Sequence, residues 1–206
     1  MRYGMVIDLT RCAACHTCAV ACKQANNLPN SMWWNKILTV GGEGMDTASG
    51  TYPNGLELHH IPIACQHCDN PPCVKACPVG ATYKRAEDGI VVQDCDRCIG
   101  CRMCSVACPY SVRAFNWKKP EYYVDHALGD YDAPKHQNNA VEKCTFCANR
   151  IARGEKPACM ELCPGRARYW GDLDDPNSEA SIALHGRMAI RLLEDRGTEP
   201  NVYYLK

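Results

Sequence analysis

The chain has 206 residues and a formal net charge of zero, with 23 Lys and Arg against 23 Asp and Glu, which excludes a polybasic nucleic-acid surface. No apolar run reaches the roughly 18–20 residues of a membrane-spanning helix, and no signal-peptide region opens the sequence. Only 35 residues are Leu, Ile, Val or Phe, whereas 17 are Cys. This thin apolar core indicates that a group bound to sulfur completes the fold.

Apart from Cys95, the cysteines form four groups along the chain. The groups are Cys12, Cys15, Cys18 and Cys22; Cys65, Cys68, Cys73 and Cys77; Cys98, Cys101, Cys104 and Cys108; and Cys144, Cys147, Cys159 and Cys163. The first and third groups have the spacing C-x2-C-x2-C-x3-C of bacterial [4Fe–4S] ferredoxins. The second, third and fourth groups end in C-x3-C-P, whereas Lys23 takes the place of the proline after the first group. An odd cysteine count without an export signal argues against a disulfide framework, so the groups indicate iron–sulfur clusters.

An internal repeat relates the two halves of the chain. An offset of 86 residues aligns Cys12 with Cys98 and Cys77 with Cys163. In two-cluster ferredoxins three cysteines of a run hold one cluster, and the fourth holds the other. We expect this fourth cysteine to lie on the short helix that follows the first three. The sequence therefore predicts a duplicated two-cluster unit.

The segments between the cysteine groups predict few regular elements. Residues 28–59 form an insert with loops at 41–44 and 49–55, which is either a surface loop or a docking surface for a partner. Trp33 and Trp34 favour docking, because aromatic residues are enriched at interfaces.

The segment between cysteine groups two and three has a clearer pattern. Residues 80–92 predict two short strands around a Glu-Asp-Gly turn, which joins groups two and three into one ferredoxin-like module. Residues 116–139 form a second insert of the same kind as 28–59, with Tyr122 and Tyr123 favouring docking.

The C-terminal segment predicts a helix and a strand. Residues 172–176 are expected to cap a helix from near Asn177 to about Leu193, with Ile182, Ala189 and Leu193 on one face. Residues 201–205 are expected to form a final strand.

Over essentially its whole length the sequence resembles the electron-transfer (beta) subunits of DMSO reductase-type molybdenum or tungsten oxidoreductases, such as dimethyl sulfoxide, polysulfide, tetrathionate and arsenate reductases. Outside the cysteine groups, the matching stretches are MVID at 5–8, HCDNPPC at 67–73, KCTFC at 143–147 and GDLDDP at 171–176. The resemblance implies an α+β fold of two pseudo-symmetric ferredoxin-like modules with long loop inserts and a C-terminal helix and strand. In one compact chain, 1–206, the parts are an outer module of 1–27 and 140–172, an inner module of 60–115, inserts at 28–59 and 116–139, and an extension at 173–206.

The resemblance also implies four [4Fe–4S] clusters and their sixteen cysteine iron ligands. The implied sets are Cys12, Cys15, Cys18 and Cys163 for cluster 1; Cys65, Cys68, Cys73 and Cys108 for cluster 2; Cys98, Cys101, Cys104 and Cys77 for cluster 3; and Cys144, Cys147, Cys159 and Cys22 for cluster 4. Cys95 is left over. It aligns with Leu9 in the repeat, so we expect it to be a small apolar packing residue.

The implied function is a one-electron relay in anaerobic respiration. The partners implied are a molybdopterin-containing catalytic subunit and a membrane anchor subunit that reacts with quinone. The chain itself is expected to have no catalytic residues. Its implied location is the extracytoplasmic (periplasmic) face, after export with the catalytic subunit, with the cytoplasm as the alternative. A free polyferredoxin electron shuttle is the competing function, but the long inserts and C-terminal extension favour a fixed subunit.

Other metal sites explain the cysteines less well. Cys12, Cys15 and His16 match the c-type haem motif, but the aligned position 102 is Arg. Zinc sites use two separated pairs, and a Rieske site needs a second histidine beside His67. We expect the histidines at 59, 60, 126, 136 and 185 to be ordinary surface or core residues.

Oxidised clusters with four thiolates each carry about −2, so cations near the cysteines are expected either to offset this charge or to be ordinary solvated residues. The candidates are Arg11, Lys23, Lys75, Arg97, Arg102, Arg113, Lys143, Arg150 and Arg166.

Overall fold

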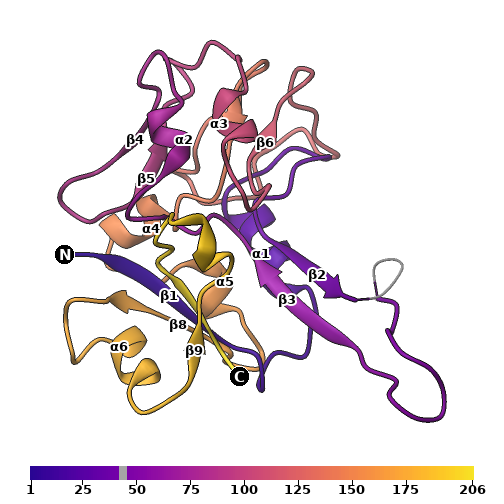
Figure 1. Cartoon of the computed structure of the whole chain (residues 1–206). Coiled ribbons are helices and arrows are strands. Elements are labelled where there is room, and N and C mark those ends of the chain that lie inside the picture. Colours follow the sequence, from indigo (N-terminus) through magenta and orange to yellow (C-terminus); the bar gives the residue numbers. More distant parts are fainter. Residues whose placement is uncertain (42–45) are drawn as a thin grey trace.

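A computed structural model of the chain describes residues 1–41 and 46–206, and Figure 1 shows the arrangement of its elements. The helices are α1 (Thr17–Ala25), α2 (Pro72–Lys75), α3 (Met103–Val106), α4 (Ala148–Ala152), α5 (Ala158–Glu161) and α6 (Glu179–Leu184), with a 3-10 turn at Glu194–Arg196. The strands are β1 (Tyr3–Asp8), β2 (Lys36–Val40), β3 (His59–Ile63), β4 (Thr82–Lys84), β5 (Val91–Gln93), β6 (Ala114–Phe115), β7 (Val141–Glu142), β8 (Arg168–Asp172), β9 (Ala189–Ile190) and β10 (Val202–Leu205).

A four-stranded sheet in the order β8-β1-β10-β9 holds both ends of the chain. β1 pairs in parallel with β10 and antiparallel with β8. Its residues from Gly4 to Asp8 are all buried, as expected for a strand covered on both faces. Val6 packs with Ala180 of α6, whereas Met5 and Ile7 pack toward the cysteine-rich part of the chain. The predicted final strand is confirmed as β10.

Three two-stranded ribbons complete the sheets: β2-β3, β4-β5 and β6-β7. The predicted pair of short strands around residues 80–92 is confirmed as β4 and β5. Gly89 has φ +73 in the turn between them, a conformation that glycine adopts without strain. The β2–β3 hairpin extends away from the rest of the chain in Figure 1.

Within the insert 28–59, residues 36–40 form a strand that was not predicted. These form β2, whose side chains alternate between buried and exposed positions against β3. Part of the loop expected at 41–44 lies outside the described residues. Trp34 is 4% exposed and packs with Cys22, Leu28 and Met32, so the docking role expected for it is wrong. Trp33 keeps 37% of its surface exposed.

The C-terminal helix is much shorter than predicted. α6 begins after Ser178, whose Oγ accepts a hydrogen bond from the Ser181 backbone N–H at 3.1 Å. It ends at Leu184, because His185 is extended and Gly186 has φ +70. Ala189 therefore belongs to a strand, and Ile182 is 61% exposed, so the expected apolar face does not form.

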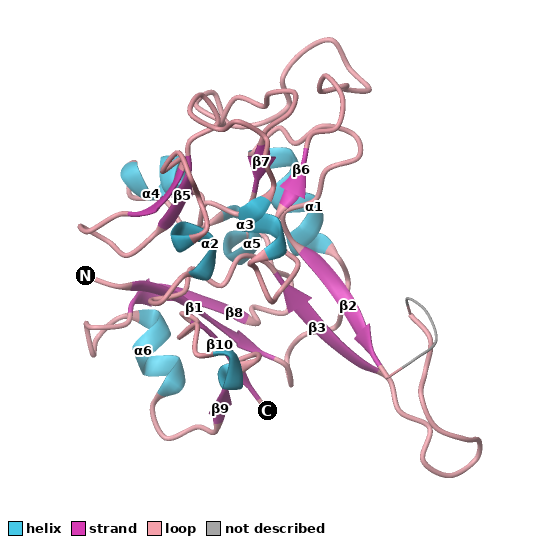
Figure 2. Cartoon of the chain, turned by 45° about the horizontal axis from the view of Figure 1, so that its top comes forward, coloured by secondary structure: helices cyan, strands magenta, loops and turns pink. Residues whose placement is uncertain are grey.

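Short helices and small sheets make up the structure, as Figure 2 shows, which agrees with the predicted α+β class. Within the described residues, no helix has the length and apolar character needed to cross a membrane.

Candidate metal centres

Five of the cysteines lie on short helices that follow the loops. They are Cys18 and Cys22 on α1, Cys73 on α2, Cys104 on α3 and Cys159 on α5. The expectation that each fourth cysteine is helical is correct only for Cys22. In the other three groups the helix has four residues and ends before the fourth cysteine, which a proline follows. α1 continues to Ala25 because Lys23 takes the place of that proline.

The backbone of the paired cysteines is the same in all four groups. In the first C-x-x-C pair of each group the second intervening residue has a left-handed φ: Ala14 (53°), His67 (43°), Gly100 (70°) and Phe146 (55°). Such turns gather backbone N–H groups into a concave anion site. The Phe146 N–H, for example, donates to the Cys144 Sγ at 3.4 Å. A non-glycine residue in this conformation costs about 1 kcal/mol or more, so its recurrence indicates a functional constraint.

The first predicted quartet, Cys12, Cys15, Cys18 and Cys163, lines one cavity, which we call cage 1. Burial raises the pKa of the Cys12 thiol, and the nearby Cys18 and Cys163 thiolates raise it further. The Ala167 N–H donates to the Cys163 Sγ at 3.4 Å. The structure thus brings a cysteine from far along the chain to the first loop.

A second cavity, cage 4, is lined by Cys22, Cys144, Cys147 and Cys159. Burial raises the pKa of the Cys159 thiol to about 12. The Asn26 side-chain amide lies beside the cavity, and its Nδ2 is 3.7 Å from the Cys22 Sγ and 4.0 Å from the Cys147 Sγ. Cage 4 therefore contains a polar donor aimed at two of its sulfurs.

A third cavity, cage 2, is lined by Cys65, Cys68, Cys73 and Cys108. Burial and the neighbouring Cys65 thiolate raise the pKa of the Cys68 thiol to about 12. All four residues therefore border one sulfur-lined space.

The fourth quartet, cage 3, consists of Cys77, Cys98, Cys101 and Cys104. The Thr82 N–H donates to the Cys77 Sγ at 3.4 Å. Burial raises the pKa of Cys104, and the nearby Cys98 thiolate adds to this shift. Cys101 is exposed at the surface.

The four cages follow one another in the order 1, 4, 2, 3. Cages 1 and 4 share Ile7 and Arg168 in their walls. Cages 4 and 2 share Cys65. The Cys73 thiolate of cage 2 raises the pKa of Cys104 in cage 3, although burial is the larger cause. The two end cages each have an exposed cysteine, Cys15 in cage 1 and Cys101 in cage 3.

Among the described residues, the buried Arg168 and the half-buried Arg113 line the cages, and Arg168 was not predicted. Arg168 is 5% exposed and donates to the Cys18 Sγ at 3.2 Å. Arg168 was not among the predicted cations, although it lies five residues beyond Cys163, the same spacing that separates the predicted Arg113 from Cys108. Arg113, which was predicted, lines cage 2.

The other predicted cations bind mainly to protein oxygens or aromatic rings. Lys143 is buried and donates to the Cys144 carbonyl at 2.9 Å and to the Val91 carbonyl. Lys23 donates to the Asn30 and Met32 carbonyls. The remaining contacts are those of Lys75 with Asn70, Arg97 with the Val79 carbonyl, Arg102 with the Trp117 ring, and Arg11 with the Tyr169 hydroxyl.

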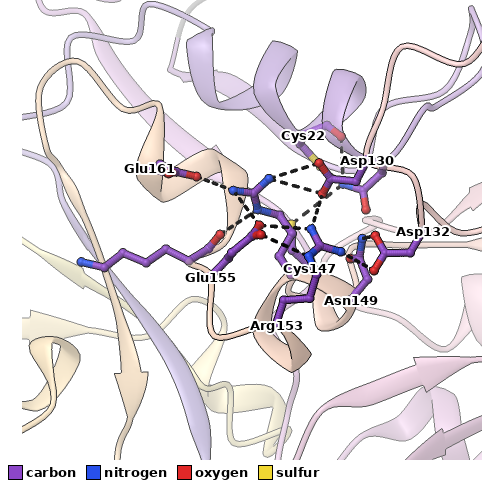
Figure 3. Close-up of polar contacts among 11 residues, drawn as sticks. Cys22, Asp130, Asp132, Cys147, Asn149, Arg153, Glu155 and Glu161 are labelled. Atoms are coloured by element: carbon purple, nitrogen blue, oxygen red, sulfur yellow. Dashed lines mark hydrogen bonds and ion pairs between the residues drawn. The ribbon is translucent and has the colours of Figure 1, made fainter.

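An ion-pair network fastens the 116–139 insert beside cage 4, as Figure 3 shows. Asp130 of the insert pairs with Arg150 at 3.2 Å and with Arg153 at 3.4 Å. Arg153 also pairs with Asp132. The Asp130 N–H donates to the Ala25 carbonyl at the end of α1. The insert therefore covers the helix that carries Cys22.

The buried histidines make packing and hydrogen-bond contacts. His67 stacks on Phe146 with ring centroids 3.7 Å apart, and its Nδ1 accepts the Val91 N–H at 3.2 Å. Burial lowers the pKa of His67 well below its ordinary value. Within residues 1–41 and 46–206, no three His, Cys, Asp or Glu side chains lie close enough to hold a single metal ion. The sulfurs instead border larger shared spaces.

Comparison with known families decides the class of these centres. The model of the 4Fe-4S dicluster domain matches residues 56–123 and 127–173, which is more than half of the chain. The chain belongs to the 4Fe-4S dicluster family. As a member of this family it is an iron–sulfur protein with [4Fe–4S] clusters.

Named relatives of this 4Fe-4S dicluster protein are subunits of oxidoreductases. It is 49% identical to a Halobacterium salinarum protein assigned as an iron–sulfur subunit of dimethyl sulfoxide reductase, over 98% of this chain and 78% of the relative. It is 40% identical to a selenate reductase subunit of Mesobacillus selenatarsenatis, over 100% and 72%. It is 36% identical to the arsenate respiratory reductase iron–sulfur subunit of a Shewanella species, over 100% and 97%. The predicted family is thereby confirmed, and this dicluster protein is an iron–sulfur electron-transfer subunit.

Proposed function

We propose that this subunit holds four [4Fe–4S] clusters, one in each cage, and conducts single electrons along the row without catalysing a reaction itself. The observation that carries the proposal is the row of cages 1, 4, 2 and 3. Cages 1 and 4 share wall residues, as do cages 4 and 2, and Arg113 of cage 2 binds Thr82 beside Cys77 of cage 3. Exposed cysteines at the two ends, Cys15 and Cys101, support a path on which electrons arrive at one end and leave at the other.

The residues of the cages fit such clusters. Each quartet supplies four thiols, the number of ligands that a [4Fe–4S] cluster takes, and left-handed turns supply backbone N–H groups. When bound, each cluster would accept and release one electron. The protein's part is to hold the sulfurs, to exclude water from the inner cages, and to place Arg168 and Arg113 beside the thiolates.

The repeat supports two modules in this proposal. The outer module contains cages 1 and 4, and the inner module contains cages 2 and 3. In each module a fourth cysteine crosses over: Cys22 joins the 144–159 cysteines, and Cys108 joins the 65–73 cysteines.

We infer that the partners are a molybdopterin-containing catalytic subunit and a membrane anchor that reacts with quinone, because the relatives are named as subunits of dimethyl sulfoxide, selenate and arsenate reductases. We place the complex on the extracytoplasmic face of the membrane, with export of the folded subunit together with its catalytic partner. Digestion of the chain by a protease added to intact spheroplasts would support this location, and protection of the chain until the membrane is broken would contradict it.

The crossed ligand sets can be tested with Cys22→Ser. We expect this variant to lose or alter the cluster of cage 4 and to leave the cluster of cage 1 intact, because Cys22 lines only the former cavity. The measurement is electron paramagnetic resonance at stepped potentials, with iron and sulfide analysis. Cys163→Ser is the matched control, since it should affect cage 1 instead.

If Cys22→Ser changes the same signal as Cys12→Ser, the proposed pairing is wrong. The role as a fixed subunit is tested separately by affinity purification of the chain from its native host. A stoichiometric molybdenum-containing partner supports it, whereas a chain that purifies alone with all its clusters favours a free electron shuttle.

A further inference from the structure

Arg168 lies between cages 1 and 4. It is the first residue of β8, and its side chain lines both cavities. Nη2 donates to the Cys18 Sγ of cage 1 at 3.2 Å, and Nη1 donates to the Cys159 Sγ of cage 4 at 3.9 Å. The same guanidinium group therefore touches one sulfur ligand in each of two cages.

The charge of Arg168 has no carboxylate partner among residues 1–41 and 46–206. Its other contacts are neutral: the Met5 Sδ at 3.3 Å and the Asn35 Oδ1 at 3.4 Å. Burial alone lowers the pKa of Arg168, but the Cys159 and Cys18 thiolates more than reverse this and hold it above its ordinary value. A buried cation without a counter-charge is costly. Its natural counter-ions are the two anionic cages.

Arg113 occupies the corresponding place between cages 2 and 3. Its Nη2 atom is buried, and the Cys73, Cys104 and Cys65 thiolates raise its pKa against the opposing effect of burial. Nη1 donates to the Thr82 Oγ1 at 3.3 Å and to the Gln93 Oε1 at 2.9 Å.

The repeat relates these two arrangements. An offset of 86 residues places Arg168 on Thr82, so the inner module has a threonine where the outer module has the arginine. Arg113, from a different segment, binds that threonine and supplies the missing charge. Each pair of cages therefore has one guanidinium group, from a different part of the chain. Arg168 donates to sulfurs of both its cages, whereas Arg113 lines cage 2 and reaches cage 3 through Thr82, whose N–H donates to the Cys77 Sγ.

We propose that each guanidinium group sets the reduction potentials of two clusters together, Arg168 those of cages 1 and 4 and Arg113 those of cages 2 and 3. This inference rests on the proposed occupation of the cages. One-electron reduction adds a negative charge to a cluster, and a fixed cation in contact with its sulfur ligands favours the reduced form. Since the site is buried, solvent and salt screen the interaction weakly. Removing the cation therefore lowers both potentials of a pair.

The test is a potentiometric titration of the whole complex with dithionite and mediators, followed by electron paramagnetic resonance. Arg168→Gln removes the charge, Arg168→Lys keeps it, and Arg113→Gln removes the charge of the other pair. Arg166→Gln is the matched control, because Arg166 is an exposed cation close to Cys163 and in the same segment.

For Arg168→Gln we expect the reduction equilibrium constants of clusters 1 and 4 to fall at least tenfold, about 59 mV for a one-electron couple, with clusters 2 and 3 unchanged. Arg113→Gln should lower the potentials of clusters 2 and 3 and leave those of clusters 1 and 4 unchanged. Arg168→Lys should shift the potentials of clusters 1 and 4 less than Arg168→Gln does, and Arg166→Gln should shift none of the four. If the Arg168→Gln variant does not assemble its clusters, the shifts measured for Arg113→Gln and Arg168→Lys still test the inference.

Three results would overturn the inference: a shift confined to one cluster of a pair, an equal shift of all four clusters, or equal shifts with Lys and Gln at position 168. A failure of the proposed function is recognised separately. In that case the unaltered complex itself would not show four titrating clusters. If only the inference fails, four clusters titrate, but their potentials do not change when these arginines are substituted.

Discussion

Three non-glycine residues in the cysteine loops have left-handed backbone conformations, which the geometry of these loops requires. Ala14, His67 and Phe146 have left-handed backbones, at a cost of about 1 kcal/mol or more each. Gly100, at the equivalent position, adopts the same φ without this strain. The strain is retained because the turn directs N–H groups toward the thiolates, where they stabilise negative charge.

Cys95 provides a prediction at this scale. It is half-buried, and burial together with the neighbouring Glu142 and Cys98 raises the pKa of its thiol to about 12, so the thiol stays protonated at neutral pH. We expect Cys95→Ala to keep about 16 irons per chain and all four cluster signals, with a stability loss of about 1 kcal/mol or less. Iron analysis and paramagnetic resonance provide the measurement. A loss of about four irons would show that Cys95 is a ligand.

Among the elements, the 116–139 insert is attached both to the α4 region and to the end of α1. The ion pairs of Asp130 and Asp132 fasten it to the α4 region, and His136 fastens it to α1. His136 Nδ1 lies 2.6 Å from the Glu142 Oε2, and its Nε2 lies 2.9 Å from the Asn26 carbonyl oxygen. Since Asn26 also faces the sulfurs of cage 4, the attachment of the insert and the wall of the cage are linked.

This histidine predicts a pH dependence of the insert. Burial lowers the pKa of His136, but the hydrogen bond and charge of Glu142 outweigh it, so the pKa is raised. A raised pKa means that the stabilisation is complete below the unfolded value of about 6.5 and is lost as the pH rises through the folded value. We expect hydrogen exchange of residues 116–139, corrected for its intrinsic rate, to increase over this range.

The control for the pH dependence is His136→Gln. It leaves Glu142 buried without its cation, so we expect a loss of about 3 kcal/mol and no further pH response of the insert above pH 6.5. Exchange of the insert that remains equally pH-dependent in the variant would assign the titration to another group.

For the whole molecule, the iron–sulfur clusters take the place of much of the apolar core. The hydrophobic clusters of the structure include cysteines such as Cys18, Cys22, Cys65, Cys73 and Cys159. Burial raises the pKa of the Cys159 thiol to about 12 and that of Cys22 well above its ordinary value, so without metal these two thiols are neutral at pH 7. Arg168 then loses the negative charge of cage 4 as a counter-charge. An unpaired buried charge costs about 3–5 kcal/mol, a large share of the stability of a domain.

We therefore expect folding to depend on the clusters. Iron chelation under oxidising conditions should abolish the cooperative thermal unfolding transition, because metal binding and folding are coupled. Calorimetry and circular dichroism of the holo- and apo-protein check this. An apo-protein that melts sharply, at a temperature near that of the holo-protein, would contradict the coupling.

The class of centre, the dicluster family and the short strands β4, β5 and β10 could be predicted from the amino-acid sequence. Ligand spacing and strand alternation are local patterns, so they can be read without knowing the fold. Local patterns failed where a single residue ended an element, as Gly186 ends α6, and where burial depended on distant partners, as for Trp34.

Only the tertiary structure decided the order of the cages and the place of the two guanidinium groups. Both depend on contacts between segments far apart in the chain, such as Arg168 with Cys18 and Arg113 with Thr82. The repeat aligned Arg168 with Thr82, but it could not show that another segment supplies the charge in the inner module. Electrostatic energy depends on distance in space and on burial, and neither is encoded by position along the sequence.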